Sequence, residues 1–298
     1  MNDILIIGAG MAGLTSAIYA VRAGRSVLVL EREGIGGQIA TSPKVENYPA
    51  AASISGAELS DRLFEQATSL GAELDFGDVT SLEQTESGFV AHTEDGDFEA
   101  KSVIIASGVH HRKLGTPREE ELFGRGVSYC AVCDGAFYKG KRVAVVGGGN
   151  TALSAAVFLA GICAEVTLIH RRDEFRAERY LVEQVKKLEN VRIVTPATVE
   201  ELLGEDKLSG LRLSNGEEIA LEGLFVCIGK VPDNAAFSAL VDLTEDGFID
   251  AGEDCRTRTE GVFVAGDCRK KEIRQLTTAA ADGSVAALAA CDYLNRIS

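Results

Sequence analysis

The sequence lacks any apolar run of the length, about 18 residues, that a membrane-spanning helix requires. Basic side chains are also in deficit, because 30 Lys and Arg stand against 45 Asp and Glu, a formal net charge of −15. Nucleic acids and anionic membrane surfaces both attract clustered Lys and Arg. We therefore expect neither a nucleic-acid partner nor a membrane partner, and we interpret the excess acid as a solvated surface.

Signs of secretion are missing as well. Met1 to Asp3 lead directly into apolar residues, without a basic n-region or a small-residue cleavage site. The seven cysteines are odd in number and scattered, unlike the disulfide framework of a secreted domain. We therefore expect a cytoplasmic location. Five cysteines lie in apolar or small-residue surroundings and are predicted to be buried thiols: Cys163, Cys227, Cys255, Cys268 and Cys291.

Cys130 and Cys133 form a CxxC pair and are the exception. Cysteines at this spacing can close a small disulfide ring, and one thiol of such a pair can have a lowered pKa. The alternative is half of a zinc site, but structural zinc takes four ligands and the chain has no second CxxC or CxxH. We therefore expect no metal. Asp134 follows the pair and is placed to exchange protons, so the predicted catalytic residues are Cys130, Cys133 and Asp134.

A strand, glycine turn, helix and strand occur twice in the chain. The first copy has its turn at 8–13 and the second at 147–152. Short apolar strands that alternate with helices predict parallel sheets covered on both faces. The expected fold class is α/β, with two Rossmann-like three-layer nucleotide-binding domains, the second inserted in the first.

Further segments complete this arrangement. Buried strands are expected at 102–108 and 223–229, a solvent-facing hairpin at 89–100, a second hairpin at 211–221, and a closing amphipathic helix at 279–297. The strand at 261–267 has no glycine turn of its own and is expected to return to the first domain. The predicted domains are 1–111 plus 241–298, and 112–240, with hinges near 110–117 and 232–240.

The first glycine turn has the composition of a dinucleotide site. Gly8 permits the tight turn, Gly10 lets the backbone approach a pyrophosphate, and Gly13 allows the helix to pack closely on the strand. Glu31 ends the next strand, where a carboxylate can accept hydrogen bonds from a ribose diol.

The second turn is followed by arginines in place of that carboxylate. The strand ends in His170, and Arg171, Arg172 and Arg176 follow it. A carboxylate would repel a 2′-phosphate, whereas guanidinium groups bind it bidentately. The second site is therefore predicted to prefer NADPH over NADH. A solvated basic turn is the alternative interpretation.

Together these motifs resemble those of low-molecular-weight, bacterial-type thioredoxin reductases over essentially the whole chain. The segments that carry the resemblance are 36–41, 45–49, 125–135, 170–177, 266–267 and 274–280. The resemblance implies an FAD- and NADPH-dependent disulfide reductase that is a homodimer and reduces thioredoxin or a thioredoxin-like protein. It also implies that Cys133 faces the flavin, that Cys130 attacks the partner, and that the NADPH domain swings between two orientations.

The resemblance assigns the cofactor-binding residues one by one. FAD is expected to contact Gly8, Gly10, Gly13, Glu31, Gly37, Gln38, Asn47, Gly266, Asp267, Arg274 and Gln275. NADPH is expected to contact Gly147, Gly149, Asn150, Thr151, Arg171, Arg172 and Arg176.

Two positions depart from the family pattern. Ser154 and Ala155 stand where a pair of glutamates is usual, and Met11 stands where proline is frequent. The first departure keeps open a same-fold reductase driven by ferredoxin, or a flavin-dependent dithiol oxidase, although neither has a use for the arginines. A flavin-binding scaffold with an inert disulfide is a further alternative. A reductase of a soluble electron carrier is another, but such relatives lack the cysteine pair.

Overall fold

The computed structural model describes residues 1–42 and 44–297 and divides the chain into two compact units. The first unit comprises Met1–His110 and Val231–Ser298, and the second comprises His111–Lys230. The two crossings are the short strands β7 (His110–His111) and β16 (Lys230–Val231), which pair with each other.

The return to the first unit comes ten residues before the expected position at 241. Phe237, Leu240 and Val241 are buried in a core cluster of the first unit, so the segment that precedes 241 already belongs to it. This hydrophobic contact is made with residues distant in the chain, and local sequence pattern does not reveal it.

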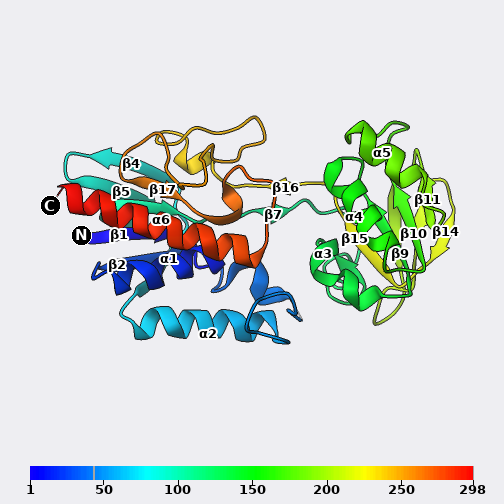
Figure 1. Ribbon diagram of the computed structural model, residues 1–298, viewed down its shortest axis with the longest axis horizontal. Coiled ribbons are helices and arrows are strands. Elements are labelled where there is room, and N and C mark those ends of the chain that lie inside the picture. The colour runs from blue at the N-terminus through cyan, green and yellow to red at the C-terminus, as the bar shows by residue number, and fades with distance from the viewer. Residues whose placement is uncertain (43, 298) are drawn as a thin grey trace. The chain divides into compact units, whose positions relative to one another are not determined.

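A seven-stranded sheet forms the centre of the first unit (Figure 1). Its path runs β3-β2-β1-β6-β5-β4, and β17 pairs with β6. The strands are β1 (Asn2–Ile7), β2 (Val27–Glu31), β3 (Glu73–Phe76), β4 (Ser81–Thr85), β5 (Gly88–Thr93), β6 (Gly96–Ile105) and β17 (Val262–Val264). The pairs among β3, β2, β1, β6 and β17 are parallel, and those among β6, β5 and β4 are antiparallel.

Both faces of this sheet are covered. Successive side chains of a strand point to opposite faces, and those of β1 pack in two different core clusters. Ile4 and Ile6 of β1 pack in a cluster with three helices: α1 (Met11–Arg22), α2 (Gly56–Ser69) and α6 (Leu276–Ile297). Leu5 and Ile7 pack in a second cluster with residues of β5 and of the segment 237–249. No helix in the described part of the chain combines the length and apolarity needed to cross a membrane.

The second unit has three layers. A parallel sheet, β11-β10-β9-β15-β8, lies between helices and a three-stranded antiparallel sheet, β12-β13-β14. Val143 and Val145 of β9 pack with the helices, and Ala144 and Val146 pack with the smaller sheet. The elements are β8 (Val127–Ser128), α3 (Ala131–Asp134), β9 (Arg142–Val146), α4 (Asn150–Ala160), β10 (Glu165–Ile169), α5 (Arg179–Lys186), β11 (Val191–Val194), β12 (Val199–Leu203), β13 (Gly210–Leu213), β14 (Glu218–Ala220) and β15 (Gly223–Val226).

The predicted α/β class with two Rossmann-like units is confirmed, and so is the hairpin at 211–221. The hairpin at 89–100 exists, with one face toward solvent, where Asp97 and Glu99 are exposed, and the other face, with Phe89, Ala91 and Ala100, buried. Its second strand also continues without a break to Ile105. Ala100 pairs with Phe89 of β5 and with Asn2 of β1, so one strand serves the hairpin and the parallel sheet.

Helix α2 was not predicted, although its start carries a recognisable signal. The Ser55 side chain accepts a hydrogen bond from the Glu58 N–H (3.1 Å), and a serine followed by glutamate three residues later is typical of a helix start.

Candidate functional site

The first glycine turn joins β1 to α1. Gly8 has φ +108°, and a Cβ there would overlap the Ala106 carbonyl, while a Cβ on Gly13 would overlap the Gly8 carbonyl. Gly10 is different, because the atom nearest to a Cβ there is the Gly36 oxygen at 3.9 Å. The chain itself therefore leaves open space beside Gly10 at the helix N-terminus. Such a space suits a pyrophosphate, so the turn fits a dinucleotide.

Glu31 is held against this turn by the main chain. Its Oε2 accepts the Ala9 N–H (2.7 Å), and its Oε1 accepts the N–H groups of Glu33 (2.9 Å) and Gly34 (3.2 Å). A carboxylate has about four acceptor positions, so one remains for a ribose hydroxyl. The carboxylate is thus oriented before any ligand binds.

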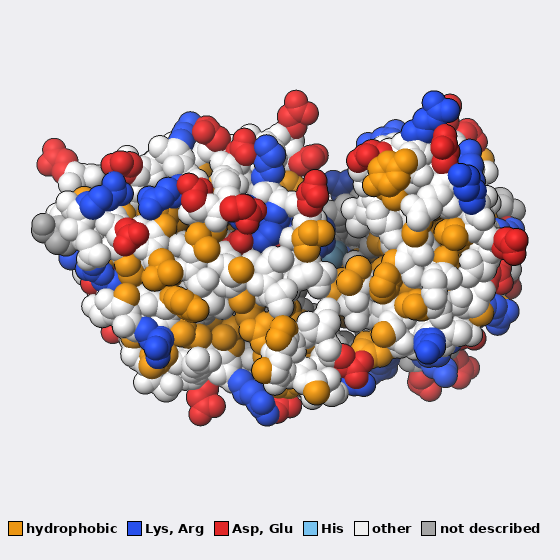
Figure 2. Space-filling view, in the orientation of Figure 1, with side chains coloured by type: hydrophobic (Ala, Val, Ile, Leu, Met, Phe, Trp, Pro, Cys, Tyr) orange, Lys and Arg blue, Asp and Glu red, His pale blue; other side chains and the backbone are white. Residues whose placement is uncertain are grey.

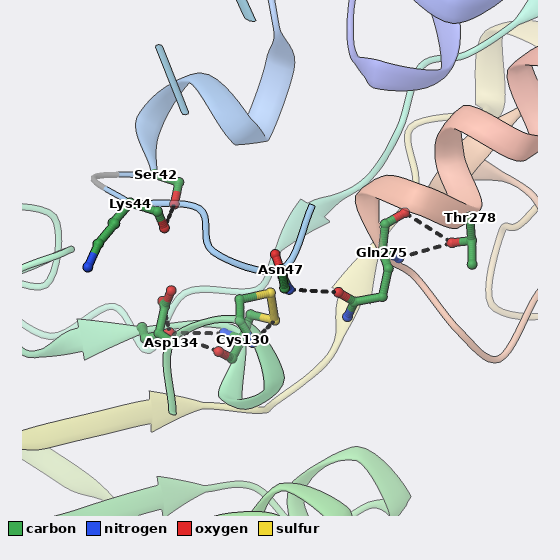
Figure 3. The surroundings of a disulfide bond; sticks show 9 residues. Ser42, Lys44, Asn47, Cys130, Asp134, Gln275 and Thr278 are labelled. Carbon is green, nitrogen blue, oxygen red and sulfur yellow. Dashed lines mark hydrogen bonds between the residues drawn. A yellow bond between two sulfur atoms is a disulfide. The ribbon is translucent and has the colours of Figure 1, made fainter. Parts of the chain in front are cut away.

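The segments around residues 37 and 47 also belong to this site. The Gly36 N–H donates to the Ala9 carbonyl (2.8 Å), which places the start of the 3₁₀ turn η1 (Gly37–Thr41) beside the glycine turn. The Gln38 side chain donates to the Val109 carbonyl. The Asn47 side-chain amide donates to Gln275 Oε1 (3.4 Å), so two predicted residues from opposite ends of the chain meet (Figure 3).

The predicted residues of the C-terminal segment are arranged around the turn η4 (Gly266–Cys268). A Cβ on Gly266 would lie 2.8 Å from the Ala12 side chain, so η4 sits on the start of α1. Arg274 donates to the carbonyls of Asp267 (3.2 Å) and Arg269 (3.3 Å) and lies over the Phe248 ring (4.2 Å). In this structure Arg274 therefore supports the loop that carries Asp267.

A buried charge cluster, which the sequence did not predict, lies beneath η4. Asp282 of α6 accepts hydrogen bonds from Arg269 (2.9 and 3.0 Å), from Lys271 (2.7 Å) and from the Gly266 N–H (2.9 Å). The side chains of Asp282, Arg269 and Lys271 are 6%, 2% and 7% exposed. The sequence carries one signal of this cluster, an aspartate among the alanines of the final helix. A charged residue on a buried helix face requires a partner of opposite charge, so Asp282 indicates a buried ion pair.

The redox pair lies at the start of α3 in the second unit. Cys130 and Cys133 form a disulfide, and the Cys133 N–H points at Cys130 Sγ (3.2 Å) (Figure 3). Cys133 is exposed and Cys130 is half-buried. A bonded pair with access to solvent is suited to thiol–disulfide exchange.

Asp134 adjoins this pair. Its main-chain N–H donates to the Cys130 carbonyl (3.1 Å), and its Oδ2 accepts the Ser128 hydroxyl (2.6 Å). Burial raises the pKa of Asp134, and the bond from Ser128 opposes that rise. A carboxyl group with a raised pKa holds a proton closer to neutrality, as proton exchange with sulfur requires.

The second glycine turn repeats the steric pattern of the first. A Cβ on Gly147 would overlap the Cys227 carbonyl, whereas a Cβ on Gly149 would meet nothing within 4 Å. The Arg176 N–H donates to the Gly148 carbonyl (2.7 Å). Asn150 exchanges two hydrogen bonds with Glu178 (2.8 and 3.0 Å), and Thr151 is exposed on the first turn of α4. The loop after β10 is thus tied to the turn, with open space beside Gly149.

The three arginines that follow His170 are exposed and, within the described residues, form no side-chain hydrogen bond or ion pair: Arg171, Arg172 and Arg176. His170 is buried and stacked on Phe175 (5.5 Å between ring centres). Burial, together with the nearby arginines, lowers the pKa of His170, so it is neutral at pH 7. The uncompensated positive charge beside the turn suits a phosphate group.

The remaining cysteines are not arranged for redox chemistry. All five are free thiols; four are buried, as predicted, whereas Cys227, which was also predicted to be buried, is half-buried. Burial raises the pKa of each, which keeps the thiols protonated and unreactive.

On the face of the molecule seen in Figure 2, acidic and basic side chains are interspersed.

Comparison with known proteins gives consistent matches over the whole chain. The model of a family described as pyridine nucleotide-disulphide oxidoreductase matches residues 2–283. The thioredoxin reductase of Bacillus subtilis (strain 168) is 42% identical over 301 residues, which cover 99% of this chain and 95% of the relative.

Solved structures similar to this chain are also thioredoxin reductases. The thioredoxin reductase from Streptococcus pyogenes MGAS5005 is 38% identical, with a TM-score of 0.95 and 99% of each chain covered. A ferredoxin-flavin thioredoxin reductase from Clostridium acetobutylicum is 33% identical, with a TM-score of 0.54 and coverage of 99% of this chain and 98% of that one.

Proposed function

The chain belongs to the pyridine nucleotide-disulphide oxidoreductase family, and on that premise we propose that it is an NADPH-dependent thioredoxin-disulfide reductase containing FAD. The observation that supports the proposal most directly is the Cys130–Cys133 disulfide with Asp134 beside it, in the same unit as a glycine turn flanked by exposed arginines. The thioredoxin reductases of similar sequence and structure support the same activity.

The first unit would hold FAD and the second NADPH. The proposed FAD-binding residues are Gly8, Gly10, Gly13, Glu31, Gly37, Gln38, Asn47, Gly266, Asp267, Arg274 and Gln275. The proposed NADPH-binding residues are Gly147, Gly149, Asn150, Thr151, Arg171, Arg172 and Arg176. When bound, FAD supplies a relay that accepts a hydride from NADPH and passes two electrons to the disulfide.

The chain's own groups carry out the sulfur chemistry. Cys130, as a thiolate, attacks the disulfide of thioredoxin and forms a mixed disulfide. Cys133 then attacks Cys130, which releases the reduced partner and restores the Cys130–Cys133 bond. Asp134 gives and takes the proton at this pair.

Anaerobic stopped-flow spectroscopy of the FAD-loaded protein tests the proposal. NADPH is expected to bleach the flavin rapidly and NADH much more slowly, and added oxidised thioredoxin should restore the flavin absorbance. The control is the Cys130→Ser, Cys133→Ser double variant, in which NADPH still bleaches the flavin but thioredoxin does not restore it. A protein that binds no FAD, or whose reduced flavin cannot open the disulfide, would contradict the proposal.

A different electron donor is the competing function, because the chain is also similar to a ferredoxin-flavin thioredoxin reductase and carries Ser154 and Ala155 on α4. The exposed arginines beside the second glycine turn favour NADPH, since ferredoxin gives them no role. Bleaching by reduced ferredoxin but not by NADPH would establish the alternative.

We also propose that the protein is a homodimer in the cytoplasm. Tyr19 of α1 and Leu288 of α6 are exposed apolar residues on helices that pack together, and a partner subunit would cover them. Free thiols are kept reduced in the cytoplasm, and five of the seven cysteines are free. Light scattering of the purified protein would give the mass of the assembly.

A further inference from the structure

We propose that Ser128 is a positioning residue of the redox centre, whose hydroxyl holds the Asp134 carboxyl and the Cys130 main chain in one arrangement. The inference rests on the proposed function, since it concerns the proton that accompanies opening of the Cys130–Cys133 bond. It adds a residue outside the CxxCD motif to the chemistry.

The Ser128 hydroxyl joins two parts of the centre. Its oxygen accepts the Cys130 N–H (3.1 Å), and its hydrogen goes to Asp134 Oδ2 at 2.6 Å in preference to the Cys130 carbonyl at 3.4 Å, because a short bond to a carboxylate is the stronger. Among the described residues, no other group bonds to the Asp134 side chain.

Ser128 is itself fixed. It is 2% exposed and lies in β8, where it is paired with Phe225 of the parallel sheet. The sheet therefore sets the position of the hydroxyl, and the hydroxyl sets the orientation of Asp134. Because Oδ2 accepts Ser128, Oδ1 is the oxygen left to carry the exchangeable proton.

The step balances with groups already named. Two electrons that originate from NADPH break the Cys130–Cys133 bond; Cys130 takes the proton of Asp134, Cys133 becomes a thiolate, and Asp134 becomes a carboxylate. That carboxylate takes the proton back from Cys130 when Cys130 attacks the partner as a thiolate. The Ser128 hydrogen bond is stronger to the carboxylate than to the acid, so it favours release of the proton.

Two substitutions of equal volume isolate the hydroxyl. Ser128→Thr keeps it and Ser128→Val replaces it with a methyl group, so any cost of added bulk in this buried strand is shared. Measured as thioredoxin reduction by the FAD-loaded enzyme across pH, S128V should lower kcat about tenfold at pH 7 and move the alkaline limb of the profile up by about one pH unit. S128T should stay within about twofold of the unchanged protein, with the same profile.

Ser209→Ala is the matched control, because Ser209 is an exposed serine of the same unit whose hydroxyl donates to the Leu203 carbonyl (3.3 Å). It should leave kcat and the profile unchanged. Flavin reduction by NADPH precedes the sulfur chemistry and should be the same in all variants. Equal profiles for S128V and S128T, or equal losses in both, would overturn the inference.

A second measurement needs neither donor nor flavin. After reduction with dithiothreitol, the rate at which iodoacetamide labels Cys130 is followed against pH, and S128V should move the midpoint of this curve by about one pH unit while S128T does not. If NADPH failed to bleach the flavin, the proposed function would fall, yet this curve would still decide the role of Ser128. An unmoved midpoint in S128V contradicts that role.

Discussion

At the scale of single residues, the arginines of this chain fall into two kinds. Arg269 is buried and satisfied by Asp282, so its charge is part of the packing. Arg171, Arg172 and Arg176 are exposed and, among the described residues, unpaired, although the chain has 45 acidic side chains that could neutralise them. Positive charge kept free in an acidic protein indicates a ligand with negative charge.

Loss of these arginines should therefore affect NADPH selectively. Arg171→Ala and Arg172→Ala are each expected to raise the KM for NADPH about tenfold or more, because a hydrogen bond to a charged group contributes about 1.5–3 kcal/mol. The KM for NADH should change less than about twofold. Steady-state kinetics with both nucleotides measures this. Arg179→Ala is the control, since Arg179 is an exposed arginine paired with Glu183 (2.9 Å); equal effects on NADH and NADPH would contradict the assignment.

Asp282 should make stability depend on pH. Burial acts to raise its pKa, but the bonds from Arg269 and Lys271 outweigh burial and lower it. A lowered carboxyl pKa means that the stabilisation is complete above about pH 4 and is lost as the pH falls through the lowered value. Asp282→Asn should cost about 3 kcal/mol at pH 7, because it leaves buried cations without their partner.

Thermal unfolding of the two proteins between pH 3 and 8 measures this difference. It should be largest at neutral pH and shrink below about pH 4. Asp292→Asn, an exposed aspartate on the same helix, should change the unfolding free energy by less than about 0.5 kcal/mol. A difference between D282N and the unchanged protein that grew on acidification would show that the sign is wrong.

At the scale of elements, the two glycine turns have the same division of roles. Gly8 and Gly147 are enclosed by the chain's own carbonyls, whereas Gly10 and Gly149 face open space. The positive φ of Gly8 and Gly147 and the close approach of the carbonyls that follow β6 and β15 explain the first pair, whereas a ligand beside the turn would explain the second. Strand β6 also has two roles, because it is the second strand of the hairpin and a member of the parallel part of the sheet.

Alanine at two glycines of one turn should thus have different consequences. Gly13→Ala places a Cβ on the Gly8 carbonyl, so α1 must shift and the FAD-free protein should lose about 3 kcal/mol or more. Gly10→Ala should leave the FAD-free protein within about 1 kcal/mol of the original but weaken FAD binding at least about tenfold. Thermal unfolding and flavin fluorescence titration separate the two. Tight FAD binding by G10A would place the pyrophosphate elsewhere.

At the scale of the whole molecule, each unit buries its own core. Two clusters belong to the first unit and two to the second, and the chain passes between the units at 110–111 and 230–231. A unit with its own core can fold alone. The central strands of each sheet are covered on both faces by residues of the same unit.

The fragment 111–230 should therefore fold by itself. We expect a cooperative thermal transition, formation of the Cys130–Cys133 disulfide, and binding of NADPH without FAD, so that the fragment is colourless. The complementary chain, with 110 joined to 231 by a short glycine linker, should bind FAD and be yellow. Circular dichroism and nucleotide titration measure these properties, and a yellow fragment 111–230 would reverse the proposed division of cofactors.

The sequence by itself determined the repeated strand–turn–helix–strand pattern, the CxxCD motif, and the exchange of a carboxylate for arginines in the second copy. Each depends on residues close together in the chain, where propensity, turn geometry and spacing act directly. The hairpin at 211–221 was predictable for the same reason.

Only the tertiary structure decided the rest. It placed the return crossing at 230–231, because Phe237 and Val241 pack in the first unit's core, and it turned Arg274 onto the carbonyls of Asp267 and Arg269. It also gathered Asp282 and its partners beneath η4. These contacts join residues that are distant in the chain, or residues that could each have bonded to several partners. Packing and burial in the folded chain, rather than local sequence pattern, determine which contacts form.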